Sequence, residues 1–264
     1  MKASTQKSNS GIILAIATLL AILATLSVNI LSNFFPARGL NIGEVANTIL
    51  RGVQVTPANY AFAIWGLIYL GLIAYGIYQL RPSECGNPTI RRVDSLLIIA
   101  CIAQIAWVYL FTLRLFWLSV VAMLAILLPL IGAYVQLGIG RERVSRARKW
   151  LAWVPFSVYL GWISVATIVN IASALYISGW DGWGISAAGW TAIMLIVGAA
   201  IAATIAIQRA DIAFTLVFIW AYVAIAIRQL DDPVIWITAV VAAIVLAVLL
   251  VWGRMRHKTL KQAD

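Results

Sequence analysis

Long apolar runs without a charged residue recur along the whole chain. Seven of the eight runs are long enough to cross a bilayer, which takes a helix of about 20 mostly apolar residues. The runs are residues 11–37, 52–80, 95–113, 115–140, 150–180, 182–208, 212–227 and 233–253. Run 212–227 is short, but the arginines that flank it can extend to the membrane interface. The pattern therefore predicts an all-α integral membrane protein with eight transmembrane helices.

The connections between the runs differ in length. Residues 32–56 form a long connection, which we expect to be partly helical and to lie over the outer end of the bundle, as a functional lid or a plain surface loop. Residues 81–94 contain two prolines and a glycine and are expected to form a cytoplasmic connector. The third and fourth runs are joined by little more than residues 112–114, so they should form a close antiparallel hairpin.

Composition and charge support the same class of protein. Hydrophobic residues make up 63% of the chain and charged residues 11%, whereas soluble domains have about 45–50% and about 25%. The net charge of +10 could indicate nucleic-acid binding, but the basic residues cluster between the runs, as the positive-inside rule requires. If the N-terminus is inside, four of the 19 Lys and Arg residues lie on the outer side. They are Arg38, Arg51, Arg114 and Arg228.

This charge distribution predicts a multi-pass protein of the inner (plasma) membrane with both termini in the cytoplasm. Membrane lipid is then an expected partner and nucleic acid is not, while a homo-oligomeric state stays open.

The sequence offers little catalytic chemistry. None of the eight runs contains a charged residue, and the sole histidine, His257, is in the C-terminal tail. Cys85 falls in a connection and Cys101 in a run, with no spacing typical of metal ligands. We therefore expect no enzymatic activity, no metal and no cofactor.

Aromatic and amide residues share helix faces in three of the runs. They are Tyr60, Phe62, Trp65 and Tyr69 in the second run, Gln104, Trp107 and Phe111 in the third, and Tyr159, Trp162, Ala166 and Asn170 in the fifth. Trp65 and Tyr69 are one turn apart on the same face, and spacings of three and four residues put each of the other two sets on one face. A buried amide should face the protein rather than lipid. The sets favour a site for a flat apolar ligand, although interfacial aromatic belts and helix packing also explain such residues.

Residues 56–69 resemble the second-helix signature of the tryptophan-rich sensory protein family, which includes the mitochondrial translocator protein. The family pattern is Pro-Pro-x-Trp-x-Phe, followed by Trp three residues on and Tyr four further. Its matching positions here are Pro57, Phe62, Trp65 and Tyr69, while Ala58 and Tyr60 replace the second proline and the first tryptophan.

Two further helices carry similar motifs. The family's third helix has Asn-x-x-Trp followed by a Phe pair, and the corresponding residues here are Gln104, Trp107, Phe111 and Thr112. Its fifth helix has Pro-Tyr-x-x-Trp, then Ala and Asn four and eight residues after the Trp. The corresponding residues are Val158, Tyr159, Trp162, Ala166 and Asn170.

The resemblance covers about residues 11–178 and implies a five-helix bundle whose pocket is lidded by the loop between helices one and two. The last three runs have no counterpart in that fold, so we expect a bundle over residues 1–180 and a three-helix extension over 181–264. The implied function is binding or transport of a hydrophobic planar ligand, such as a porphyrin or a sterol, with Arg51 the arginine nearest to meet its carboxylates.

Two other functions stay open. The chain could be an accessory subunit that docks onto another membrane complex and binds no small molecule. An enzyme acting on a bound tetrapyrrole is less well supported, because no general acid or base is visible in the runs.

The predicted topology can be tested with reporter fusions. Fusions after Ala37, Leu113, Asp181 and Asp231 should report an external location, and fusions after Lys149 and Lys261 an internal one, because this arrangement keeps most basic residues inside. An external reading for the fusion after Lys261 would contradict the eight-span topology.

Overall fold

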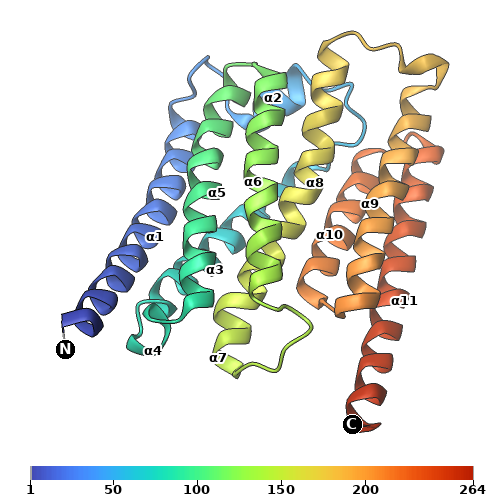
Figure 1. Ribbon diagram of the computed structural model, residues 1–264. Helices are drawn as coiled ribbons and strands as arrows, with labels where there is room; N and C mark the ends of the chain where they lie inside the picture. Colours follow the sequence, from blue (N-terminus) through green and yellow to red (C-terminus); the bar gives the residue numbers. More distant parts are fainter. Residues whose placement is uncertain (1, 264) are drawn as a thin grey trace. The chain divides into compact units, whose positions relative to one another are not determined.

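All regular elements in the described part of the chain are helices (Figure 1). The computed structural model describes the backbone of residues 2–263 and the side chains of residues 11–256, so the side chain of His257 lies outside the described residues. The elements are α1 (Lys2–Phe34), α2 (Ile42–Thr48), η1 (Asn59–Ala63), α3 (Ile64–Tyr78), α4 (Pro82–Cys85), α5 (Pro88–Thr112), α6 (Phe116–Gln136), α7 (Arg146–Arg148), η2 (Lys149–Trp153), α8 (Val154–Ile177), η3 (Gly182–Gly184), α9 (Ala187–Arg209), α10 (Ile212–Arg228) and α11 (Pro233–Ala263).

The expected all-α membrane class is confirmed, and the expected number of eight spans is roughly consistent with the structure. Seven segments are long and apolar enough to cross a membrane, and α10 is a shorter apolar helix of 17 residues. The chain is therefore an all-α, multi-span membrane protein. The partly helical character expected for the loop 32–56 is also confirmed, because α2 lies inside it.

Close backbone contacts group the chain into two compact units. Unit 1 comprises Met1–Ile42 and Trp65–Leu160, and unit 2 comprises Gly43–Ile64 and Gly161–Asp264. The loop before α3 thus belongs with the C-terminal helices, and the residues of α8 are shared between the units. The expected boundary after residue 180 implies that the first five helices can fold alone. The grouping by contacts does not test this, so the boundary stays a prediction.

Unit 1 is organised around α5, which packs against both α1 and α6 (Figure 1). The connection from α5 to α6 is as short as the sequence predicts, and Arg114 turns the chain there with a positive φ of 65°. The Thr25 hydroxyl of α1 approaches the Cys101 carbonyl of α5 at 3.4 Å. Directly after α3, the Gln79 amide donates to the Ala15 carbonyl of α1 at 2.9 Å.

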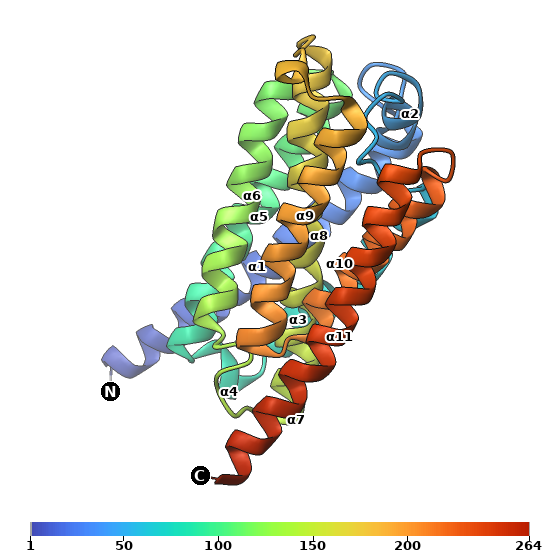
Figure 2. The same cartoon turned by 90° about the vertical axis from the view of Figure 1, so that its right-hand side faces the viewer.

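In unit 2, α9, α10 and α11 pack against one another (Figure 2). Side chains set where two of these helices begin: Ser186 accepts from the Gly189 amide before α9, and Asp211 accepts from the Phe214 amide before α10. Helix α10 has buried residues on most of its circumference. Neighbouring helices therefore cover much of α10.

The prediction that the spans contain no charged residue is wrong for α5. This helix begins at Pro88, where Asn87 caps the first turn by accepting from the Thr89 amide at 3.0 Å. Arg91, Arg92 and Asp94 are therefore helical residues of the third span, and Asp94 is buried at 1% exposure. The charge-free run begins only after Asp94, at residue 95. The Asn87 cap and Pro88 start the helix seven residues before that point.

The close approach of α9 and α11 predicts the effect of one substitution. A Cβ at Gly253 of α11 would overlap the Ala206 carbonyl oxygen of α9, and small residues permit such contacts between membrane helices. Gly253→Ala should lower the free energy of unfolding by about 1–3 kcal/mol through overpacking, as measured by thermal unfolding in detergent. Gly66→Ala is the matched control, because a Cβ there meets nothing within 4 Å. Equal stability of both variants would contradict this packing.

Candidate functional site

An aromatic cluster with one amide occupies the interior of unit 1. Trp65 stacks on Tyr69 of the same helix, with ring centroids 5.8 Å apart and an interplanar angle of 27°. Its ring also meets Tyr159 of α8 edge-on at 6.3 Å. The Tyr159 hydroxyl approaches Oε1 of Gln104 in α5 at 3.4 Å. The cluster thus joins side chains from α3, α5 and α8.

Two polar atoms in this cluster lack hydrogen-bond partners among the described residues: the Tyr69 hydroxyl and Nε2 of Gln104. Gln104 is fully buried and Tyr69 is 5% exposed. A buried polar atom without a partner costs about 1–3 kcal/mol. Both atoms carry hydrogens, so each can donate a hydrogen bond to an acceptor.

A second aromatic group continues along α5. Trp107 and Phe111 stack with centroids 5.1 Å apart, and Phe111 meets Phe116 of α6 edge-on at 5.5 Å. All three side chains are buried. The face predicted for Gln104, Trp107 and Phe111 therefore points into unit 1, as the cost of exposing an amide to lipid requires.

The remaining candidate residues belong to unit 2. Phe62 of η1 meets Trp162 of α8 edge-on, with ring centroids 5.8 Å apart. Trp162 and Asn170 are both 2% exposed, and Pro57 is also buried. Tyr60 differs, since it is 40% exposed and packs edge-on at 5.1 Å against Trp220 of α10. The Trp220 indole also donates to the Ala61 carbonyl at 3.3 Å.

The loop before α3 is held by the C-terminal end of α10. One guanidinium nitrogen of Arg228 donates to the Asn47 side-chain oxygen at 3.0 Å and lies 3.3 Å from the Pro57 carbonyl. The Asn47 amide in turn donates to the side-chain oxygen of Asn59 at 2.9 Å. One arginine thus ties together three points of the loop.

Two more contacts fasten the same loop. The Gln229 side chain donates to the Gln54 carbonyl at 2.8 Å, and the Ala58 amide donates to the Ala224 carbonyl at 3.1 Å. We call this set of bonds from α10 to residues 47–59 the loop clasp. No spacing in the sequence predicts the loop clasp, and Arg228 was interpreted only as a charge flanking a short span.

The candidate residues thus fall into two groups, which the structure describes separately. Trp65, Tyr69, Gln104, Trp107, Phe111 and Tyr159 are in unit 1, and Pro57, Tyr60, Phe62, Trp162 and Asn170 are in unit 2. Their convergence on one cavity stays a prediction. Trp220 and Asp94 were not among the candidates, since one lies in a run interpreted as packing and the other lies before the apolar run of its helix.

These features define a multi-span helical membrane protein with aromatic and amide side chains buried between its helices. A family model described as TSPO-like protein matches residues 15–252 of the chain. The chain therefore belongs to the TSPO-like family, which confirms the resemblance carried by the three motifs. No curated protein and no solved structure matches it.

The family match extends beyond the motif-bearing region. It continues through α9 and α10 and into α11, although these helices have no counterpart in the five-helix fold that the motifs imply. The C-terminal helices are accordingly part of what the family model describes.

The loop clasp predicts a local change on removal of one side chain. Arg228→Gln should speed amide exchange in residues 43–58 about 10- to 100-fold, because a hydrogen bond to a charged group contributes about 1.5–3 kcal/mol. Hydrogen–deuterium exchange with mass spectrometry measures this loop directly. Arg51→Gln is the matched control, since Arg51 is exposed. Unchanged exchange in Arg228→Gln would show that other contacts hold the loop.

Proposed function

We propose that the chain binds or transports a hydrophobic planar ligand of the tetrapyrrole or sterol kind within the membrane. The observation that supports this most is the pair of buried, unpartnered donors, the Tyr69 hydroxyl and the Gln104 amide, beside the Trp65 ring. Small-molecule sites combine apolar walls with a few polar groups that fix orientation. Membership of the TSPO-like family supports the same function.

The chemistry of the cluster narrows the ligand class. Two donors favour a ligand with hydrogen-bond acceptors, such as carbonyl, carboxylate or ring-nitrogen atoms. A stacked tryptophan and tyrosine favour a flat ring system, because offset aromatic stacking adds about 0.5–1.5 kcal/mol beyond burial. A carboxylate on such a ligand would suit an arginine such as Arg51, which is exposed between α2 and η1.

The proposed setting is the inner (plasma) membrane with both termini in the cytoplasm, on the strength of the charge distribution. Residues 32–56 would then lie on the outer side, where the loop could cover a ligand. The loop clasp gives α10 a part in this function, since it holds the segment that would act as the lid.

Porphyrin titration of the purified protein tests the proposal. Protoporphyrin IX binding, followed by the absorption of the porphyrin, should weaken several-fold or more in Trp65→Ala and in Trp162→Ala through loss of a flat wall. Gln104→Leu should weaken it about 2- to 10-fold, since one hydrogen bond contributes about 0.5–1.5 kcal/mol.

Two control variants separate the site from general effects. Trp252→Ala removes an exposed indole of α11, and Gln208→Leu makes the same change as Gln104→Leu at an exposed position of α9. Both should bind porphyrin as the unmodified protein does. Porphyrin binding that none of the site variants alters would overturn the proposed site, and absence of binding would favour the accessory-subunit function.

A further inference from the structure

A buried carboxyl group lies in unit 1, outside the aromatic cluster. Asp94 of α5 is 1% exposed and accepts a hydrogen bond of 2.6 Å from the hydroxyl of Tyr75 in α3, which is fully buried. Tyr75 in turn packs edge-on against Phe156 of α8, with ring centroids 5.0 Å apart. Three helices thus enclose one aspartate and its tyrosine donor.

An ionisable residue inside a membrane span is costly and usually has a function. A carboxylate in an apolar site must be paired or must take up a proton. The hydroxyl donor of Tyr75 stabilises the ionised form, because hydrogen bonds to charged acceptors are short and strong. The same carboxyl oxygen can also remain an acceptor after protonation, since an acid group keeps acceptor capacity.

Charged groups of two neighbouring elements act on Tyr75 with opposite signs. Glu84 of α4 and Arg148 of α7 both interact electrostatically with Tyr75. The elements Gly11–Phe34 and Phe116–Gln136, which pack against α5, contain no Asp, Glu, Lys or Arg.

The pair lies close to one end of unit 1. Asp94 is six residues from the start of α5, about 9 Å along the axis, and Tyr75 is three residues from the end of α3. One turn beyond Tyr75, Gln79 is fully buried and its Oε1 has no partner among the described residues. A buried acceptor thus lies directly after the end of α3.

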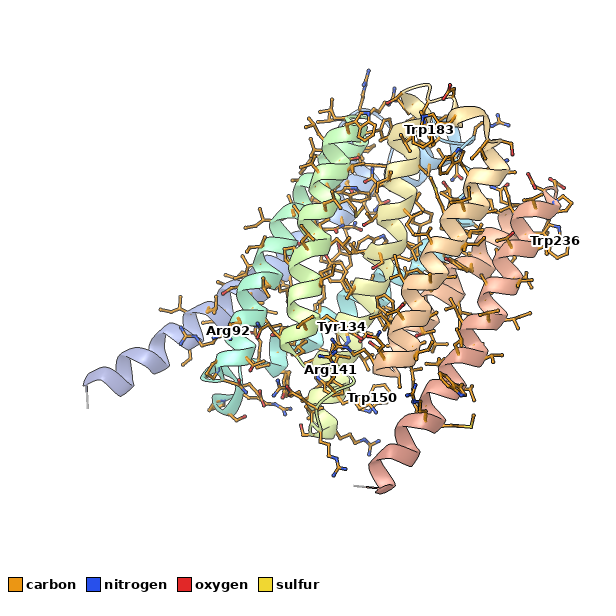
Figure 3. All side chains as sticks on the ribbon, turned by 45° about the vertical axis from the view of Figure 1, so that its right-hand side comes forward. Arg92, Tyr134, Arg141, Trp150, Trp183 and Trp236 are labelled. Carbon is orange, nitrogen blue, oxygen red and sulfur yellow. The ribbon has the colours of Figure 1, made fainter. Side chains whose placement is uncertain are left out.

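Basic side chains gather at this end of the unit. Figure 3 shows Arg92 and Arg141 there, together with Trp150. The path from the pair to the surface is therefore short at this end of unit 1. A path to the opposite end would run along the remaining length of α5.

We propose that Asp94 is a proton-binding site that exchanges its proton with water at the basic end of unit 1. In the ionised state the carboxylate accepts the Tyr75 hydroxyl hydrogen. On protonation a proton from water adds to the free carboxylate oxygen, which becomes a donor, and Gln79 Oε1 supplies the next acceptor along the route. This site is separate from the ligand donors Tyr69 and Gln104, so it does not depend on the proposed ligand.

Infrared difference spectroscopy tests the site directly. In a pH titration of the purified full chain, the C=O stretch of a protonated carboxyl should appear as a titrating band that Asp94→Asn lacks. The band should move to lower frequency in D₂O, because an exchangeable proton becomes a deuteron. In Tyr75→Phe it should move to higher frequency, because the carboxyl loses its hydrogen-bond donor.

Asp231→Asn is the matched control, since it makes the same change at an exposed position and should keep the band. Identical spectra for the unmodified protein and Asp94→Asn would overturn the proposal. A band that fails to shift in D₂O would also overturn it, because the proton would then be locked in the structure. If Asp94→Asn does not fold, the frequency shift in Tyr75→Phe decides, and an unshifted band there counts against the site.

Discussion

Hydrocarbon offers polar groups no hydrogen-bond partners, and this constraint orders most of what is seen between the helices. The Thr18 hydroxyl turns back to the Leu14 carbonyl of its own helix, and the Tyr222 hydroxyl reaches the Leu195 carbonyl of a neighbouring one. Against this background the few buried polar atoms without partners stand out. The Tyr69 hydroxyl and the Gln104 amide are such atoms, and they draw attention to one place in unit 1.

Much of the fold could be predicted from the sequence, because long apolar runs and their basic flanks reflect the bilayer directly. The hairpin from α5 to α6 and the helix within the first loop were predicted in this way. The start of α5 was not predicted, since its apolar run begins only after Asp94, whereas the cap and the proline start the helix earlier. A buried carboxyl group with a tyrosine from another helix leaves no trace in the spacing of either helix.

The candidate site was predictable only in its local part. Spacing puts Gln104 and Trp107 on one face of a helix, but it does not say which residues of other helices they meet. Arg228 and Trp220 illustrate the limit, because their partners Asn47 and Ala61 lie far away in the sequence. Contacts of that range depend on how helices pack, which a single sequence does not reveal.

The loop clasp has a consequence for biosynthesis. Asn47 and Arg228 are separated by 181 residues in the chain. At a translation rate of about 5–20 residues per second, Arg228 is synthesised about 10–40 s after Asn47. During that interval the polar groups of the loop must form hydrogen bonds with water or with a chaperone. Completion of the chain, and not insertion of the first helices, is then the event that brings this loop to its final form.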